Sequence, residues 1–459
     1  MNRLLTVIAL GLLVGCAHFQ PRPISAEKTA ADFEARSLSD TNLEQFLEVN
    51  LPPDDPSRRS WNLRALTLVA FYYHPDLAVA RAQWAVTQAG QITAGERPNP
   101  SISFTPTYDT TTPPPWIFTL DWDIPIETAG KRGYRIAQAQ HLSEAARWKF
   151  VTTAWQVRSR VRSSLLDLYS ATQTESLLAQ QESAQSNVVR LLEGQFQAGN
   201  VSEFEVTQAR IALDTTRLSL QDAQRQEVQA RATMAEALGL PLRALNGVEL
   251  SFAGLDEFPT SLTEPEVRRQ AILNRADVRG ALAEYAASQS ALQIEIAKQY
   301  PDVHLGPGYE LDQTDDKWSL GATVTLPILN QNQGAIAEAR ATREQAATQF
   351  QAVQAAAIGE IDRTLAGYQS ALKQSATASA LVQNSQKRLD SVRAMQQAGE
   401  LDPLAVANAR VEYNTGALAR LGALVQAQQA LGQLENAVQS PLTLPTSVLD
   451  AAAHNPESR

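Results

Sequence analysis

The chain has 459 residues, enough for two or three ordinary domains. Aromatic residues make up only 6% of it, which favours long helices with small contact residues over a compact core. The formal net charge of −10 argues against nucleic acid as a partner. Beyond the first residues, no stretch reaches the roughly 18 apolar residues of a membrane-spanning helix.

The first residues are typical of an export signal. A short positively charged start is followed by an apolar stretch over residues 4–14, and the segment ends in Leu13-Val14-Gly15-Cys16. This ending resembles a bacterial lipobox, in which residues 1–15 are the signal peptide that is removed and Cys16 is acylated. Cys16 is the only cysteine, so an internal disulfide is excluded. We therefore expect a covalent lipid on Cys16 and sorting to the outer membrane; an ordinary signal peptide with an incidental cysteine is the alternative.

Residues 16–60 are expected to form an acylated, extended arm, because they contain scattered prolines and little periodicity. A helix is predicted from about Trp61 to Glu96, where prolines stop it, and a β-hairpin over about 100–126. The proline-free stretch Arg135–Gln197 predicts one helix of roughly 95 Å. A returning helix from Glu203 to Ala237 is expected to lie antiparallel to it.

The same plan recurs about 200 residues later in the chain. Ala198-Gly199 and Ala398-Gly399 are each followed eleven residues later by Ala-Arg. A tandem duplication of this size indicates one architecture used twice, since the period is too long for a solenoid. The predicted organisation is repeat 1 over 61–241, an inter-repeat segment over 242–262, repeat 2 over 263–441 (hairpin about 301–328, long helix 335–397, returning helix 403–437) and a C-terminal tail over 442–459.

The turns between the paired helices carry capping signals. Gly199 and Gly399 are expected just past the long helices, where a left-handed backbone costs glycine little. Ser202 and Glu205 form a capping box at the start of the first returning helix, and Asp402 followed by proline starts the second. Small residues recur every seven positions on both returning helices, which predicts close contact with a partner helix. They are Ala209, Thr216, Ala223, Ala230 and Ala237, and Ala409, Gly416, Ala423, Ala430 and Ala437.

Between the helices of each repeat, apolar and polar residues alternate with a period of two, over 116–124 and 318–326. Strands of about ten residues with one apolar face fit a membrane barrel. Trp116, Trp122 and Trp318 are then expected near a membrane interface, which aromatic side chains favour. A soluble sandwich gives the same alternation, but the export signal and expected acylation favour the barrel.

Four strands cannot close a barrel, and open sheet edges are not tolerated in lipid. The chain is therefore expected to pair its edges with other copies of itself. Two copies give eight strands around a filled interior, so three copies form the smaller assembly with an open conduit, and four are not excluded. Asp121 and Asp123 are expected on the lumen face, either favouring cations or simply as polar residues of a wet wall.

With these features the chain resembles the TolC-like outer membrane efflux proteins, in particular their lipid-anchored heavy-metal and drug efflux branch. The resemblance covers residues 60–441 and rests on the duplicated plan and on local motifs, which are Arg97-Pro98-Asn99-Pro100, Gly130-Lys131-Arg132, Leu326-Pro327-Ile328 and Asn332-Gln333-Gly334. It implies a mainly α fold with a small β part, a homotrimer with a twelve-stranded outer-membrane barrel, and a periplasmic α-barrel of long antiparallel coiled-coil helices. It also implies an inner-membrane pump and a periplasmic adaptor that contacts the helical tips Ala198, Gly199, Ala398 and Gly399.

Acidic residues near the tips are candidates for a periplasmic aperture, because a threefold assembly turns each into a ring of carboxylates. These residues are Glu203, Glu205, Glu400 and Asp402. Capping already explains Glu205 and Asp402, and simple solvated charge is an equal alternative for the other two. Members of the family often carry aspartates later on the returning helices, where this chain has Ala405 and Asn408, so an aspartate gate is not carried over.

No arrangement of residues predicts an enzyme, a metal site or a cofactor other than the lipid. The five histidines lack metal-ligand spacing, and no motif specifies a nucleophile with its base. The leading interpretation is a passive outer-membrane exit channel of a tripartite pump that exports small toxic solutes, either metal cations or drugs. The alternatives are the duct of a type I protein secretion system and a coiled-coil structural lipoprotein without a pore.

Overall fold

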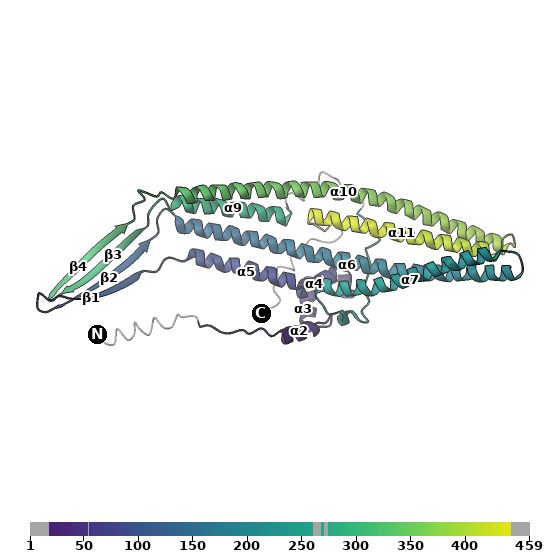
Figure 1. The fold of residues 1–459 in the computed structure, drawn as a ribbon, viewed down its shortest axis with the longest axis horizontal. Coiled ribbons are helices and arrows are strands. Elements are labelled where there is room, and N and C mark those ends of the chain that lie inside the picture. The colour runs from purple at the N-terminus through teal and green to yellow at the C-terminus, as the bar shows by residue number, and fades with distance from the viewer. Residues whose placement is uncertain (1–17, 54, 260–267, 270–273, 442–459) are drawn as a thin grey trace.

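The computed structural model describes residues 18–53, 55–259, 268–269 and 274–441. The molecule is elongated, with a small sheet at one end and the turns of two long helix pairs at the other (Figure 1). The expected signal peptide, acylated Cys16 and C-terminal tail lie outside the described residues. Within those residues, no helix combines the length and the apolar character that crossing a membrane requires.

Repeat 1 contains the helices and strands predicted for it, with one break. Its elements are α4 (Leu63–Tyr73), α5 (Pro75–Gly95), β1 (Ser101–Tyr108), β2 (Trp116–Ile126), α6 (Lys131–Gln197) and α7 (Glu203–Leu238). The single helix predicted for 61–96 is wrong, because Pro75 lacks an N–H and disfavours helical backbone at His74. His74 instead caps α5. With 67 residues, α6 spans about 100 Å.

Repeat 2 follows the same order with α9 (Ala276–Ala297), β3 (Val303–Asp312), β4 (Asp315–Val324), α10 (Gln333–Gln397) and α11 (Pro403–Val438). The predicted long helices are confirmed, with 65 residues in α10. Strand β4 starts three residues before Trp318 and ends before Leu326, which is 67% exposed in the connection to α10. The expected small-residue seam is confirmed, since Ala223, Ala237 and Ala437 are buried against neighbouring helices.

The long helices form a single layer whose order follows from their contacts. α6 packs against α7 on one side and α11 on the other, and α10 packs against α11. Nearer the sheet, α5 packs against α6, and α9 lies between α6 and α10 (Figure 1). One edge of the layer is therefore formed by α5 and α7, and the other by α10.

The prediction of an extended arm is wrong for its described part. Residues 18–60 contain α2 (Ala26–Glu34), α3 (Thr41–Asn50) and the short helix η1 (Pro56–Arg58). Leu43 and Phe46 of α3 are buried in the main core together with Leu66, Phe71 and Leu238.

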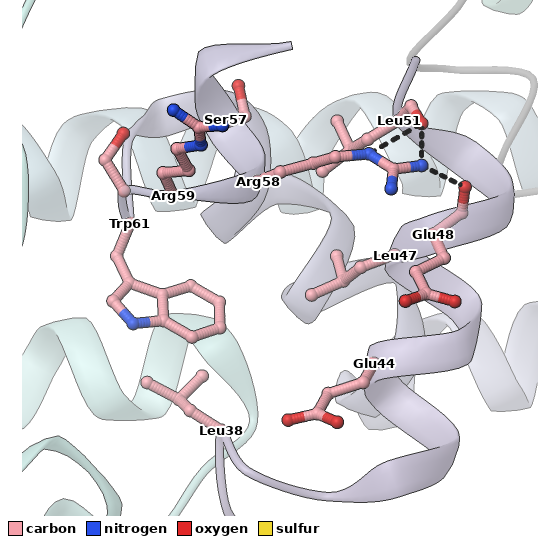
Figure 2. Close-up of a pocket in the computed structure, with 10 residues that line it drawn as sticks. Leu38, Glu44, Leu47, Glu48, Leu51, Ser57, Arg58, Arg59 and Trp61 are labelled. Carbon is pink, nitrogen blue, oxygen red and sulfur yellow. Dashed lines mark hydrogen bonds between the residues drawn. The ribbon is translucent and has the colours of Figure 1, made fainter. Parts of the chain in front are cut away.

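A polar contact fixes the fold of this arm. The Nε and Nη2 atoms of Arg58 donate to the carbonyl oxygen of Leu51, and Nη2 also reaches that of Glu48 at 2.7 Å (Figure 2). These contacts satisfy carbonyls at the end of α3. Pro52 and Pro53 thus separate α3 from η1 instead of keeping the whole segment extended.

The four strands form one antiparallel sheet in the order β1-β2-β3-β4. The register pairs Phe104 with Leu120, Leu120 with Tyr309, and Tyr309 with Trp318. Residues directly opposite one another point to the same face, so these apolar side chains form a continuous surface across all four strands. The alternation predicted from the sequence is therefore confirmed, and β1 and β4 are edge strands.

Candidate functional site

Both helical tips end in the same turn. Gly199 and Gly399 follow α6 and α10 with φ angles of 75° and 80°. The N–H of Asn200 donates to the carbonyl of Gln195, and that of Glu400 to the carbonyl of Met395, both at 2.9 Å. These are the long bonds of a Schellman motif, which requires a left-handed residue at the glycine position. The predicted glycine turns are confirmed, and they place Ala198 and Ala398 at the extreme end of the molecule.

The returning helices are capped as the sequence predicts. The backbone N–H of Ser202 donates to Glu205 Oε2 at 2.8 Å, and the N–H of Glu205 reaches Ser202 Oγ at 3.4 Å, which completes a capping box. Asp402 Oδ1 accepts the N–H of Ala405 at 2.9 Å. Glu205 and Asp402 therefore stabilise the helix starts, whatever else they do.

Glu203 and Glu400, the other two acidic candidates, are exposed at the same end. Neither side chain forms an ion pair or a hydrogen bond with another of the described residues. They are therefore the unengaged carboxylates of the tips. Their positions leave open both roles considered from the sequence, a carboxylate ring in an assembly and plain solvated charge.

The structure adds a contact between the two tips that sequence reasoning missed. Gln195 Nε2 of α6 donates to Asp402 Oδ2 at 3.2 Å, and so joins the first helical hairpin to the second. The two residues are 207 positions apart and the repeat does not reveal the contact, since Met395 occupies the position equivalent to Gln195. Asp402 thus caps α11 with one oxygen and holds the neighbouring hairpin with the other.

A row of exposed apolar residues on α7 is the second feature that sequence reasoning missed. Phe204, Ile211 and Leu218 are 74%, 63% and 69% exposed and follow one another at intervals of seven residues. Such spacing keeps them on one side of a helix. The pattern was present in the sequence, since Ile211 and Leu218 each follow a residue of the small-residue seam by two positions. Because α7 forms an edge of the helix layer, this row faces away from the chain's own helices.

The second face of the sheet is strongly acidic. Five carboxylates share it with two basic side chains; these residues are Asp121, Asp123, Glu310, Asp312 and Asp315, with His304 and Lys317. His304 Nδ1 lies 2.9 Å from Asp123 Oδ1, and Lys317 pairs with Glu310 and Asp312. Asp121 and Asp123 lie on the polar face, as the alternation in the sequence predicts, and the position of that face on a lumen stays a prediction. At Gly308, a Cβ atom would lie 2.5 Å from both Asp121 Oδ1 and Ser319 Oγ, so glycine makes room for the aspartate.

Trp116, Trp122 and Trp318 lie on the apolar face, but they are at different positions along the strands. Trp116 pairs with Tyr108 at the loop end of β2, whereas Trp318 is level with Leu120, four residues along that strand. Trp122 lies two residues further on. A common depth therefore depends on the tilt of the strands, and their place at a membrane interface stays a prediction.

Comparison with known proteins identifies relatives of the chain. The family model described as "Outer membrane efflux protein" matches residues 70–240 and 267–438. The chain is 25% identical over 261 residues to the cobalt-zinc-cadmium resistance protein CzcC of Cupriavidus metallidurans, and 24% identical over 212 residues to the pyoverdine export outer membrane protein OpmQ of Pseudomonas aeruginosa. These matches cover 56% and 45% of the chain, but only 61% of CzcC and 44% of OpmQ.

Among solved structures, the outer-membrane channel OprN aligns with this chain at a TM-score of 0.69 and 18% identity. The alignment covers 94% of this chain and 100% of the OprN chain. The Campylobacter jejuni outer membrane channel CmeC gives a TM-score of 0.67 at 17% identity, over 95% of this chain and 97% of its own. At this level of identity the likeness concerns the fold. The chain therefore has the same overall fold as these two channel proteins.

Proposed function

Because the chain belongs to the outer membrane efflux protein family, we propose that it forms the exit duct of a tripartite efflux system and passively conducts small toxic solutes out of the cell. The family, OpmQ and OprN are all described as outer-membrane proteins, and this chain has the same location. The observation that carries the proposal is that one chain has a four-stranded sheet and a helix layer that are both open at both edges.

Open edges support closure by further copies of the chain. β1 and β4 have unpaired outer sides, and lipid does not tolerate unpaired backbone groups. Closing the sheet of one copy onto the next brings α10 of one copy toward the α5 and α7 edge of its neighbour, where Phe204, Ile211 and Leu218 are exposed. A homotrimer with twelve strands is the assembly that we propose.

We assign the tips to a periplasmic adaptor and to the aperture. Exposed Phe196, Phe204 and Met395 surround the turns at Gly199 and Gly399, and offer apolar surface for docking. The contact between Gln195 and Asp402 supports a closed arrangement of the two hairpins within one copy. In a trimer, Glu203 and Glu400 add carboxylates at this narrow end, and an inner-membrane pump would deliver solute to it.

A lipid on Cys16 fits the course of the arm. Residues 18–25 lead from α2 toward the end of the molecule that holds the sheet (Figure 1). An acyl chain attached two residues earlier would then enter the membrane on the side where the barrel is proposed. The lipid anchors the chain, while the strands supply the route across the membrane.

The acidic face of the sheet supports cations among the exported solutes. Five carboxylates against Lys317 and His304 leave the face with net negative charge in each copy, and rings of carboxylates favour cations in pores. The name of CzcC is that of a metal resistance protein, and that of OpmQ includes pyoverdine export. We therefore place metal cations first and organic toxicants second.

Two experiments test this function. The full-length lipoprotein, purified in detergent, is expected to run as a heat-dissociable trimer and to give stepwise conductance in planar bilayers; absence of both would favour a structural lipoprotein without a pore. A deletion strain is expected to become sensitive to cobalt, zinc or cadmium, and to recover with the intact gene. Sensitivity to none of a panel of metals and drugs, together with loss of a secreted protein, would identify a secretion duct instead.

The aperture is tested separately by Glu203→Gln and Glu400→Gln, with Asp222→Asn on the exposed side of α7 as the matched control. If the tip carboxylates form selective rings, the two glutamine variants lower cation selectivity and weaken block by divalent cations in the same bilayers. Unchanged selectivity and block in both would remove these residues from the aperture.

A further inference from the structure

The two repeats build the same joint with different chemistry. In each repeat, the residue just before α5 or α9 lies against the long helix and the end of the returning helix. The repeat-1 joint consists of His74, Asp76, Arg160 and Gly239, and the repeat-2 joint of Arg275, Asp277, Glu360 and Gln439. Equivalent members lie 200 or 201 positions apart. His74 thus corresponds to Arg275, and Arg160 corresponds to Glu360.

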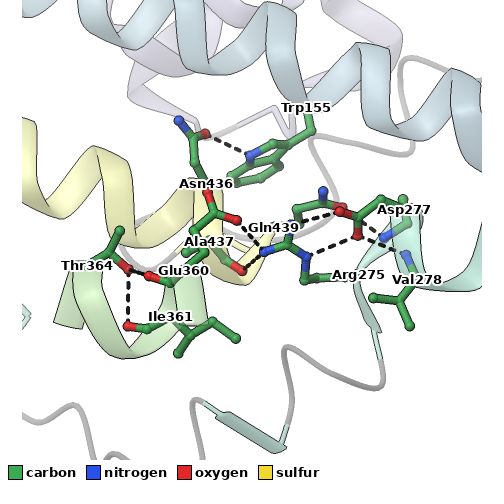
Figure 3. A network of polar contacts seen from close by, with 11 residues as sticks. Trp155, Arg275, Asp277, Val278, Glu360, Ile361, Thr364, Asn436, Ala437 and Gln439 are labelled. Carbon is green, nitrogen blue, oxygen red and sulfur yellow. Dashed lines mark hydrogen bonds and ion pairs between the residues drawn. The ribbon is translucent and has the colours of Figure 1, made fainter. Parts of the chain in front are cut away.

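The repeat-2 joint is a network of ion pairs and hydrogen bonds centred on an arginine (Figure 3). Arg275 is buried and donates from Nε and Nη2 to the two carboxylate oxygens of Asp277 at 3.0 and 2.7 Å. Its Nη1 donates to Glu360 Oε2 at 2.9 Å and to the carbonyl of Ala437, the last turn of α11. Burial lowers the pKa of Arg275, but its bonds to Asp277 and Glu360 outweigh this and raise it overall. An arginine never deprotonates in the physiological range, so this joint keeps its charge.

In the repeat-1 joint a titratable ring takes the place of the arginine. His74 is only 5% exposed. The backbone N–H of Asp76 points at its Nδ1 at 3.2 Å, and Arg160 Nη1 lies 3.0 Å from its Nε2. Both neighbours can only donate. A neutral imidazole has one nitrogen that accepts, so it satisfies one of these contacts, whereas an imidazolium satisfies neither and points two N–H groups at them.

The surroundings of His74 oppose a positive charge on balance. Burial is the largest influence and lowers its pKa, and Arg160 of α6 lowers it further. Asp76 of α5, whose Oδ2 lies 3.8 Å from Nδ1, and Glu236 of α7 act in the opposite direction but do not reverse the shift.

The ring also has little room to move away. A Cβ atom at Gly239 would lie 3.1 Å from His74 Cα, so the backbones of α5 and α7 are already in contact. From the arm, Arg36 Nη1 donates to the carbonyls of Tyr73 and Gly239 at 3.0 and 2.9 Å, which adds another positive charge to the joint.

We propose that the repeat-1 joint is an acid-sensitive hinge: neutral His74 holds the start of α5 against α6 and α7, and its protonation loosens this contact while the repeat-2 joint stays closed. The sign follows from linkage, because a histidine whose pKa is lowered in the folded state binds its proton more readily once the joint opens. The stabilisation is complete above the ordinary pKa of 6.5 and is lost as the pH falls from there through the lowered value.

Hydrogen exchange of the full-length protein in detergent, read by mass spectrometry, tests the proposal. Protection factors, corrected for the intrinsic pH dependence of exchange, are compared at about pH 7.5 and about pH 5.5. Peptides covering 74–80 and 234–240 are expected to lose protection by up to about tenfold at the lower pH, the limit for a group with an ordinary pKa of 6.5. Peptides from 275–281 and 434–440 serve as the internal reference and should not change.

Two variants separate the hinge from general acid unfolding. His74→Asn keeps an acceptor for the N–H of Asp76 but cannot titrate, so the pH-dependent loss in repeat 1 should disappear. The double variant His74→Arg/Arg160→Glu transplants the pair of repeat 2 and should give both repeats the same flat pH profile. Equal loss of protection in both joints of the unmodified protein, or an unchanged loss in His74→Asn, would overturn the proposal.

Discussion

Replacing Glu435 by glutamine is expected to destabilise the protein strongly. Glu435 lies on α11 with none of its surface exposed. Its Oε2 is 3.1 Å from Arg158 Nη1 and 3.4 Å from Arg162 Nε, both on α6. The two arginines are themselves 1% and 5% exposed. A single carboxylate therefore balances two buried guanidinium groups at the seam where repeat 1 meets repeat 2.

The expected cost follows from what the substitution leaves behind. Removing one partner of a buried ion pair costs about 3–5 kcal/mol, because a buried charge loses its compensation. Burial already lowers the pKa of Arg162, which indicates that the site solvates charge poorly. Glutamine keeps the size of glutamate and an acceptor oxygen, so we expect the lower end of the range, about 3 kcal/mol.

Urea unfolding of the full-length protein in detergent, followed by circular dichroism, measures this effect. Glu412→Gln is the matched control, since Glu412 lies on the same helix and also pairs with an arginine, Arg388, at 3.0 Å. There the side chains of Arg388 and Glu412 are 64% and 47% exposed, so the change should cost at most about 1 kcal/mol. Equal losses in the two variants would refute the assignment of a compensating role to Glu435.

Three further predictions follow from contacts described for the chain. Gly432→Ala places a methyl group against the guanidinium of Arg162, which donates to Gln428 at 2.8 Å. It should lower the urea midpoint by the equivalent of about 1.5–3 kcal/mol. Gly422→Ala, where a Cβ atom meets open space, should leave the midpoint unchanged. Asp402→Asn weakens the cap of α11 and its contact with Gln195, and should increase the open fraction in single-channel records; an unchanged open fraction would separate that contact from the aperture. Ile211→Glu puts a charge in the exposed apolar row of α7 and should shift the heat-dissociable trimer toward monomer on gels without loss of helical signal.

Much of the fold is predictable because its signals are local. A helix of 67 residues needs good helix formers and no proline, and a strand with one apolar face needs strict alternation. The capping box at Ser202 and the glycine turns depend on residues within a few positions of one another. Because the chain is duplicated, each of these patterns occurs twice, and the order of helices and strands predicted for repeat 2 supports the order predicted for repeat 1.

The failures arise where contacts join distant parts of the chain. Prolines in the arm suggested extended backbone, yet Leu43 and Phe46 acquire a buried environment from α4 and α7, and this stabilises a short helix. From the sequence, Arg158 and Glu435 would be assigned to the solvated faces of two polar helices. No nearby residue indicates that these two side chains, 277 positions apart, contact each other. The link between Gln195 and Asp402 has the same origin.

Charged and apolar side chains are distributed differently at the seam between the repeats, where contacts are satisfied within one chain, and at the edges of the sheet and the helix layer, where they are not. At the seam between α6 and α11, charged groups are buried and matched within the chain, as at Glu435, and Gln428 additionally donates to the carbonyls of Leu255 and Glu257 in the segment between the repeats. At the edges the pattern is reversed, since apolar side chains such as Ile211 are exposed and the outer sides of β1 and β4 are unpaired. The hydrogen bonds of buried charged groups depend strongly on direction, so they hold two helices in one relative position. Apolar contact is not directional, so two helices that meet through an apolar row can shift along each other. The repeats of one chain should therefore move together at the seam, and adjustments of the duct should occur at the edges and at the helical tips.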